Sequence, residues 1–342
     1  MDEKTAVNRI LGRILDEASG LDRRVRIMEV CGTHTMVITS SGLRSLLPEG
    51  VELISGPGCP ACVTPQRTVN QAVALAMEGL SLATFGDMLD VPCPNGSLAG
   101  AKAGGADVNV VESPIDALGY DVFFAIGFDT TAPNTAVAVG EGLTVLNAHK
   151  RFLPAMKALL ESGEVGVDGF INPGHVSTIV GSDAYGILDV PQVVAGFTPL
   201  DVLEAVLMLL RQINRGERRV ENEYSRAVEP EGNLRAQKVL DSVFYTGDSE
   251  WRGLGVIPDS GFLLRKRYAQ QDAEVAYGRT LEKTPNVVPN RGCVCGEVLR
   301  GVIGPRKCRL FGRDCTPSEP QGPCMVSSEG SCRIEYEYGD LF

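Results

Sequence analysis

Three short apolar segments in the first hundred residues each run into a polar turn that contains glycine. The segments and their turns are 25–30 before 31–35, 51–54 before 55–65, and 80–84 before 85–92. Apolar runs of this length, bounded by turns and followed by helical periodicity, are typical of buried strands. In a parallel sheet the carboxyl ends of the strands lie along one edge, where open α/β sheets bind their ligands. The pattern therefore predicts a parallel α/β fold with a shared site at these turns.

The second turn contains two cysteines three positions apart, Cys59 and Cys62, in a stretch rich in glycine and proline. This spacing allows the two sulfurs to form a disulfide or to bind one metal, and low thiol pKa values are common there. The glycines allow close approach of the backbone to a ligand, and the prolines stiffen the turn. We expect this turn to be the centre of the site.

Other polar residues follow the remaining strand-like segments. They are Cys31, His34, Asp87, Asp129, Thr130 and His175. Each has an ordinary structural interpretation as well: Cys31 alone would fit as a small buried hydrophobe. Asp129 and Thr130 would cap the helix after them, or hold an anion at its N-terminus.

The alternation of strands and helices divides into two units. The sequence therefore predicts an α/β protein with two small parallel-sheet domains facing a cleft, and a mostly helical and loop part after them. The expected parts are an N-terminal helix packing on the C-terminal part (1–24), a first α/β domain (25–118), a second α/β domain (119–216) and the C-terminal part (217–342).

Charge and hydropathy restrict the partners and the compartment. The formal net charge of -11, without a basic block, argues against nucleic-acid binding. No apolar run is long enough to span a bilayer, and residues 1–4 lead into an amphipathic helix, which is not the pattern of a signal peptide. We expect a cytoplasmic protein. In that reducing compartment, ten cysteines indicate metal binding or redox chemistry.

Six of the ten cysteines lie in the last fifty residues: Cys293, Cys295, Cys308, Cys315, Cys324 and Cys332. Four thiolates on loops rich in glycine and proline suit a cubane iron–sulfur cluster or a structural zinc ion. Zinc sites usually contain a closely spaced cysteine pair, whereas the last four cysteines are seven, nine and eight positions apart. This spacing favours an iron–sulfur cluster over a structural zinc ion. Cys293 and Cys295 are either further ligands or a separate thiol pair.

Taken together, these turns resemble the family of the hydrogenase maturation factor HypD. The matching stretches are 28–35, 55–65, 85–92, 127–133, 172–176 and 308–332, in order over nearly the whole chain. Two positions depart from the family pattern. Met36 stands where the family often has a second histidine, which leaves His34 as the only histidine of that turn, and Asp129 stands where the family has glutamate.

The resemblance implies a scaffold that makes the Fe(CN)2(CO) unit of [NiFe]-hydrogenases. Such proteins have two α/β domains and a third part with a [4Fe-4S] cluster; they hold the iron with the small chaperone HypC and receive cyanide from HypE. When the family's residue roles are assigned to the matching positions of this chain, Cys31 is expected to bind the transient iron. Cys59 and Cys62 are then the expected redox-active pair. The implied cluster ligands are Cys308, Cys315, Cys324 and Cys332.

A thiolate from Cys31 is a suitable soft ligand for such iron, and His34 is placed to accept its proton. Two other functions remain open. One is an enzyme, a thiol–disulfide oxidoreductase fed by an iron–sulfur cluster, which explains the two sets of thiols but not Cys31 and His34 at a neighbouring strand end. The other is a zinc-bound interaction scaffold.

Overall fold

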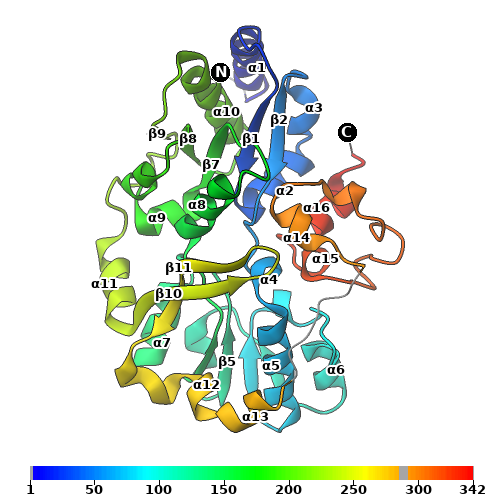
Figure 1. The fold of residues 1–342 in the computed structure, drawn as a ribbon, viewed down its shortest axis with the longest axis vertical. Helices are drawn as coiled ribbons and strands as arrows, with labels where there is room; N and C mark the ends of the chain where they lie inside the picture. The colour runs from blue at the N-terminus through cyan, green and yellow to red at the C-terminus, as the bar shows by residue number, and fades with distance from the viewer. Residues whose placement is uncertain (1–2, 285–291, 342) are drawn as a thin grey trace.

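The computed structural model describes residues 3–284 and 292–341. This description leaves out residues 1–2, 285–291 and 342. They belong to the expected N- and C-terminal parts. The described chain forms two parallel sheets, one above the other in Figure 1, with a β-hairpin between them and the C-terminal helices packed at one side. The predicted α/β class with two parallel sheets is confirmed.

The first sheet has five parallel strands in the order β2-β1-β7-β8-β9. Their bounds are β1 Val25–Glu29, β2 Val51–Ser55, β7 Gly169–Pro173, β8 Gln192–Ala195 and β9 Val220–Asn222. The three central strands are almost entirely buried because helices cover both faces, which explains why they are apolar without alternation.

The second sheet has four parallel strands in the order β4-β3-β5-β6. Their bounds are β3 Leu82–Thr84, β4 Val108–Val110, β5 Val122–Ala125 and β6 Val145–Asn147. The strands are short, and the central two, β3 and β5, are fully buried.

The sheets do not follow the expected division of the chain at residues 118 and 119. The chain leaves the first sheet after β2, forms the whole second sheet, and returns to the first sheet at β7, which pairs with β1. Each sheet therefore takes strands from both expected α/β domains. Strand pairing between distant segments decides this arrangement, and local periodicity carries no information about it.

Helix α1 (Glu3–Ala18) packs mainly on α10 (Pro199–Arg215). The sequence suggested the C-terminal part as its neighbour, but its buried face, with Ile10 and Ile14, joins the apolar cluster of α10 behind the first sheet. Arg211 of α10 also pairs with Glu17 at 3.1 Å. The apolar stripe of α1 fits the longer apolar stripe of α10, which accounts for the contact.

The remaining helices connect the strands and cover the sheets. Those before the hairpin are α2 Gly32–Ser40, α3 Leu43–Leu46, α4 Pro60–Val63, α5 Gln66–Met77, α6 Leu98–Ala103, α7 Ala132–Gly140, α8 Phe152–Ser162, α9 Gly174–Val180 and α11 Leu234–Val243. The short 3-10 helices are η1 Gly86–Met88, η2 Pro114–Ala117, η3 Asp183–Ile187, η4 Lys266–Gln271 and η5 Pro305–Lys307.

The hairpin consists of the antiparallel strands β10 (Phe244–Trp251) and β11 (Gly255–Leu264). Its tip reaches the C-terminal part, where a β-carbon placed on Gly253 would come within 2.4 Å of the α-carbon of Gly296. The helices after the hairpin are α12 Ala273–Ala276, α13 Gly278–Glu282, α14 Cys295–Leu299, α15 Pro323–Val326 and α16 Ser331–Tyr338. The hairpin thus links the two sheets to the cysteine-rich part.

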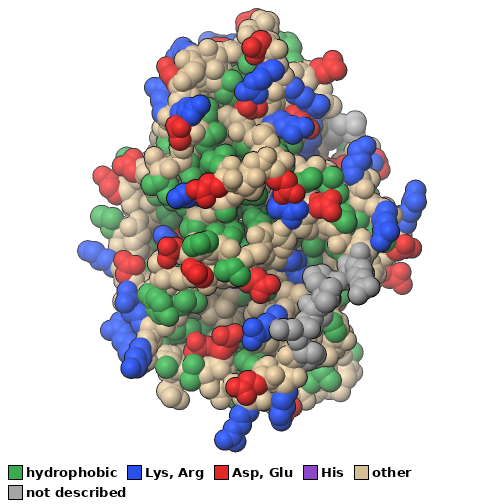
Figure 2. All heavy atoms as spheres, in the orientation of Figure 1, with side chains coloured by type: hydrophobic (Ala, Val, Ile, Leu, Met, Phe, Trp, Pro, Cys, Tyr) green, Lys and Arg blue, Asp and Glu red, His purple; other side chains and the backbone are tan. Residues whose placement is uncertain are grey.

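Within residues 3–284 and 292–341, no helix is long and apolar enough to cross a membrane. On the face shown in Figure 2, acidic and basic side chains are interspersed and no continuous basic area is visible.

Candidate functional site

The Cys31 turn and the disulfide turn are in contact because β1 and β2 are neighbouring strands. The register pairs Glu29 with Ser55, so both strands end at the same level. The backbone N–H of Gly32 donates to the carbonyl of Gly58 at 3.2 Å. A β-carbon placed on Gly58 would come within 2.3 Å of the Cys31 nitrogen. The two turns therefore pack backbone against backbone, as the sequence predicted for these two strand ends.

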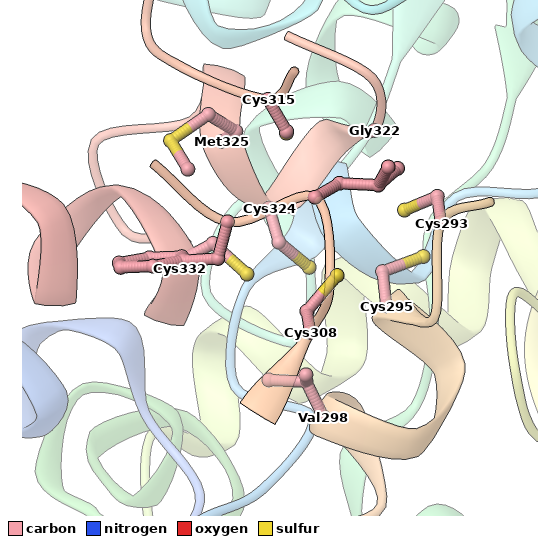
Figure 3. A pocket seen from close by; sticks show the side chains of 11 residues that line it. Cys293, Cys295, Val298, Cys308, Cys315, Gly322, Cys324, Met325 and Cys332 are labelled. Carbon is pink, nitrogen blue, oxygen red and sulfur yellow. The ribbon is translucent and has the colours of Figure 1, made fainter. Parts of the chain in front are cut away.

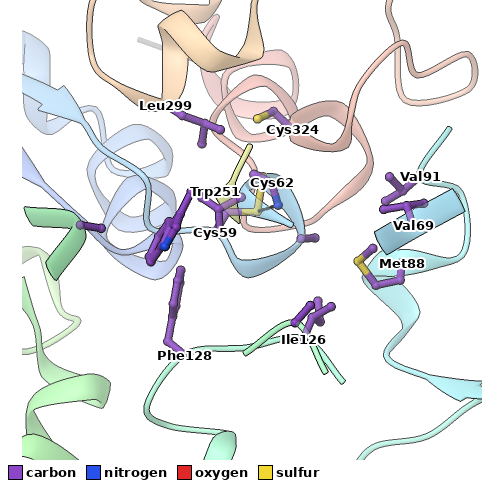
Figure 4. Close-up of a cluster of buried hydrophobic side chains, with 14 of the residues drawn as sticks. Cys59, Cys62, Val69, Met88, Val91, Ile126, Phe128, Trp251, Leu299 and Cys324 are labelled. Atoms are coloured by element: carbon purple, nitrogen blue, oxygen red, sulfur yellow. Dashed lines mark hydrogen bonds between the residues drawn. A yellow bond between two sulfur atoms is a disulfide. The ribbon is translucent and has the colours of Figure 1, made fainter. Parts of the chain in front are cut away.

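Cys59 and Cys62 form a disulfide, and their exposed fractions are only 3% and 0%. Cys59 precedes the short helix α4, and its Sγ accepts a hydrogen bond from the N–H of Cys62 at 3.2 Å. Helices α14 and α15 of the C-terminal part pack on α4. Figure 4 shows Trp251 and Cys324 in the same cluster of buried side chains as the disulfide. The disulfide is thus enclosed by the hairpin and the C-terminal part.

Two carboxyl groups, the buried one of Glu29 and the half-buried one of Glu329, lie near Cys31, which is 8% exposed. Glu29, the last residue of β1, accepts hydrogen bonds from the N–H of Cys31 at 3.1 Å and from the hydroxyl of Thr35 at 2.5 Å. Glu329, from the turn between α15 and α16, accepts from the hydroxyl of Thr33 at 3.2 Å. Segments about 300 residues apart in the chain therefore meet at one thiol.

These surroundings disfavour negative charge on Cys31. Burial raises the pKa of Cys31 to about 12, and the carboxylates of Glu329 and Glu29 add to the effect. Burial also raises the pKa of Glu29 and of Glu329. A bound cation reverses such a balance, because it stabilises a thiolate and neighbouring carboxylates together. The arrangement suits a soft metal cation at Cys31.

The rings of His34 and His175 both stack on the ring of Phe197, which was not among the predicted site residues. Their ring centroids are 4.9 and 3.8 Å from that of Phe197, and both pairs are stacked. Nε2 of His34 hydrogen-bonds the carbonyl of Gly196 at 2.9 Å. Its Nδ1 is buried without a hydrogen-bond partner among the described residues. Burial lowers the pKa of His34 to about 4, so this ring is neutral near pH 7.

Asp87 joins the site through the C-terminal turn. It lies in η1, directly after β3, and its carboxylate accepts a hydrogen bond from the N–H of Ser328 at 3.3 Å. Ser328 precedes Glu329 in the chain, so Asp87 helps to fix the turn that faces Cys31. The sequence predicted all three strand ends on one edge of a single sheet, and this is wrong for β3, which belongs to the other sheet. Asp87 reaches the site through its contact with the C-terminal turn.

Asp129 and Thr130 do not cap α7, the helix that follows them. The cap position is Thr131, which makes no side-chain capping bond. Asp129 instead accepts a hydrogen bond at 3.1 Å from the N–H of Phe152, the first residue of α8. Burial raises the pKa of Asp129 to about 6. Thr130 is half-buried beside it.

All six C-terminal cysteines line one apolar cavity, which Figure 3 shows from close by. The other residues of its wall are Val298, Leu310, Phe311, Gly322 and Met325. Hydrogen bonds with Cys293 and Cys324 hold the pKa of Cys295 well below its usual range. The cavity therefore gathers Cys293 and Cys295 with the four thiols that the family resemblance assigns to a cluster.

This cavity fits the chemistry of an iron–sulfur cluster. Cluster ligands are thiolates in surroundings with little water, and here the thiols share an apolar lining. Among the described residues, no three histidine, cysteine or acidic side chains are arranged to hold a single metal ion. Cys308, Cys315, Cys324 and Cys332 remain the predicted ligands, with Cys293 and Cys295 adjacent.

Four ionisable groups of this region, three of them buried and Glu329 half-buried, were not predicted. Glu29 had a signal, since it is an acidic residue at the end of an apolar strand. Glu329, Arg252 and His149 had none, because only the folded chain brings them to the site; His149 contacts the Gly127 turn, where a β-carbon on Gly127 would come within 3.2 Å of its ring.

Comparisons with known proteins agree with the geometry. The family model HypD, described as "Hydrogenase formation hypA family", matches residues 5–339. Hydrogenase maturation factor HypD2 of Bradyrhizobium diazoefficiens is 45% identical, with 92% of this chain and 89% of the relative aligned. HypD of Escherichia coli is 43% identical, with 97% and 95% aligned. A putative hydrogenase expression/formation protein of Methanocaldococcus jannaschii is 41% identical, with 99% and 98% aligned.

The match covers every turn described above, and it extends through the thiol cavity to residue 339. From the family model and these relatives, the chain belongs to the HypD family of hydrogenase maturation factors.

Proposed function

We propose that this protein is the scaffold on which the Fe(CN)2(CO) unit of [NiFe]-hydrogenases is assembled. Cys31 anchors the iron through its thiolate, together with a cysteine of a HypC-type chaperone, and a HypE-type donor delivers the cyanide. The observation that carries the proposal is the position of Cys31, a buried thiol between Glu29 and Glu329 and in contact with the disulfide turn.

The residues around Cys31 have separate tasks in this proposal. The carboxyl groups of Glu29 and Glu329 supply negative charge that favours the arrival of a cation. Nδ1 of His34 is the candidate acceptor for the thiol proton, since it has no hydrogen-bond partner among the described residues and the ring is neutral near pH 7. Asp87, Asp129, Thr130 and His175 hold the surrounding turns.

Cys59 and Cys62 store two electrons as a dithiol and release them on forming the disulfide. Cys308, Cys315, Cys324 and Cys332 would hold a [4Fe-4S] cluster, which supplies one-electron redox chemistry when bound. The contact of α14 and α15 with α4 places this cavity beside the disulfide.

The alternative, a thiol–disulfide oxidoreductase acting on a protein disulfide, fits less well. Exchange with a protein substrate needs an accessible attacking sulfur. Here both sulfur-bearing residues of the disulfide are at most 3% exposed. The oxidoreductase function also leaves the carboxyl groups around Cys31 without a role.

We further propose that the protein acts in the cytoplasm, in line with its charge and hydropathy.

Infrared spectroscopy of the protein purified anaerobically with its HypC-type chaperone tests the proposal. The same sample is assayed for iron and sulfide. We expect bands of bound cyanide and carbon monoxide, and more iron than one four-iron cluster accounts for. A cluster without these bands would favour the oxidoreductase. Zinc without iron would contradict both functions.

A further inference from the structure

Arg252, at the tip of the hairpin, is a buried cation between the disulfide turn and the thiol cavity. It is only 7% exposed. Its backbone N–H donates to the carbonyl of Val63 at 2.8 Å, the last residue of α4. Its side chain donates from Nε to the carbonyl of Thr64 at 2.8 Å and from Nη1 to the amide oxygen of Gln66 at 2.5 Å. Arg252 therefore fastens the chain directly after the Cys59–Cys62 disulfide.

Arg252 also lies beside the thiol cavity, because the next residue, Gly253, packs on Gly296 at the start of α14, next to Cys295. Burial lowers the pKa of Arg252, and Cys295, Cys324 and Cys293 act on this pKa in the opposite direction. Arginine nevertheless stays protonated in proteins. The nitrogen Nη2 is buried and has no hydrogen-bond partner among the described residues. Arg252 therefore keeps one charged N–H group, at Nη2, that makes no hydrogen bond with the described residues. This group belongs to the residue that lies between the disulfide and the cavity cysteines.

The backbone keeps this placement tight. Gly253 follows Arg252, and Gly296 follows Cys295; the two glycines are so close that a β-carbon on either would come within 3.0 Å of the other. The carbonyl of Gly253 also accepts a hydrogen bond from the side chain of Arg300. The hairpin tip is therefore held against the start of α14, and Arg252 has little freedom to move away from the cavity.

We propose that Arg252 is a positioning residue that holds the Cys59–Cys62 turn against the thiol cavity and whose positive charge favours the arrival of electrons there. The inference rests on the proposed function, since it assumes that a redox group occupies the cavity. Adding an electron to a thiolate-bound cluster adds negative charge, and opening the disulfide with two electrons leaves two thiolates before protons bind. A cation buried nearby stabilises both reduced forms.

Two substitutions separate charge from hydrogen bonding. Arg252→Gln removes the charge and retains a polar side chain, whereas Arg252→Lys keeps the charge and loses the fork of donors. Arg151→Gln is the matched control, because Arg151 also binds the hairpin, through the carbonyl of Asp259 at 3.0 Å, but does not hold its tip. In each full-length protein, purified anaerobically, two quantities are measured. One is the midpoint potential of the visible absorption of the cluster. The other is that of the Cys59–Cys62 disulfide, which is equilibrated with small dithiol buffers until the ratio is constant, quenched with acid, and alkylated in the unfolded protein for mass spectrometry.

We expect Arg252→Gln to lower the ratio of reduced to oxidised cluster about tenfold at a fixed solution potential. This corresponds to a decrease of about 59 mV in the midpoint potential of the cluster, a one-electron couple. The disulfide potential falls as well. Arg252→Lys and Arg151→Gln stay within about twofold of the wild-type ratio. Equal falls in the Gln and Lys variants would assign the effect to hydrogen bonding and overturn the charge role, as would an unchanged Arg252→Gln protein.

Two further outcomes remain decisive. If Arg252→Gln does not fold, Arg252→Lys decides. A tenfold decrease in its ratio of reduced to oxidised cluster overturns the proposal, because the lysine keeps the charge. If the wild-type protein carries no cluster, the proposed occupant of the cavity fails by itself. The disulfide potentials then still decide the role of Arg252.

Discussion

Gly32 lies so close to Glu329 that a β-carbon placed on Gly32 would come within 2.4 Å of the Glu329 β-carbon and 2.7 Å of its carbonyl oxygen. This contact joins the turn after β1 to the turn between α15 and α16. It brings the C-terminal part, with its six cysteines, against the residue that follows Cys31. The site is therefore built across the chain, and its integrity depends on a position without a side chain.

Gly32→Ala should separate these two turns. The added methyl group meets backbone atoms of Glu329, which have little room to move, so we expect a loss of about 1–3 kcal/mol in the free energy of unfolding. The hydrogen bond from Thr33 to Glu329 should also be lost, with faster hydrogen exchange at 327–331. Gly50→Ala is the control, because nothing lies within 4 Å of a β-carbon there. Equal stability of the two variants would show that the turns adjust.

Cys31→Ala should abolish the loading of iron with cyanide and leave the visible spectrum of the C-terminal part intact. The thiol is the only soft ligand at the end of β1, while the six cavity cysteines lie on other segments. Infrared and visible spectra of the same anaerobic sample measure both properties. Cys93→Ala is the control, since Cys93 is not part of the cavity wall and pairs through its backbone with Gly96. Normal cyanide bands in Cys31→Ala would rule out Cys31 as the anchor.

Cys315→Ala should lose the brown colour of an iron–sulfur cluster and retain the folded α/β part. Cys315 is a cavity residue on a loop after η5, away from both parallel sheets. Visible absorption reports the cluster, and far-ultraviolet circular dichroism reports the sheets and helices. With Cys93→Ala again as control, an unchanged visible spectrum would remove Cys315 from the ligands and bring Cys293 or Cys295 into its place.

Much of the site was predictable because its parts are local. An apolar run followed by a turn with glycine marks a strand end, and this alone placed Cys31 beside Cys59 once both strands were parallel neighbours. The cysteine spacing indicated a second thiol site in the same way. These patterns can be read from the sequence because each lies in one segment of the chain: the turns at 31–35 and 55–65, and the cysteines at 293–332.

The rest depends on contacts between distant segments. The return of the chain to the first sheet at β7 follows from pairing with β1, to which no pattern in the sequence points. Glu329 and Arg252 reach the site only through the packing of the C-terminal turn and the hairpin tip. A buried charge of this kind looks like an ordinary surface residue in the sequence, and its partners appear only in the fold.

Asp129→Asn should change how stability depends on pH. The pKa of Asp129 is about 6 in the folded protein, against 3.8 as its ordinary value, so the folded state binds the proton more tightly. The stability that the neutral carboxyl contributes is present below about pH 4 and is lost as pH rises through 6. A difference of about two pKa units corresponds to about 3 kcal/mol.

The asparagine side chain of the variant does not titrate and still accepts the hydrogen bond from the N–H of Phe152. We therefore expect the free energy of unfolding of the wild type, minus that of the variant, to fall by about this amount between pH 4 and pH 7 in urea titrations. Buried His34 and His149, whose pKa values are lowered, act in the opposite direction but equally in both proteins. A difference independent of pH would mean that Asp129 is ionised with its ordinary pKa, and that the Phe152 contact alone holds the turn.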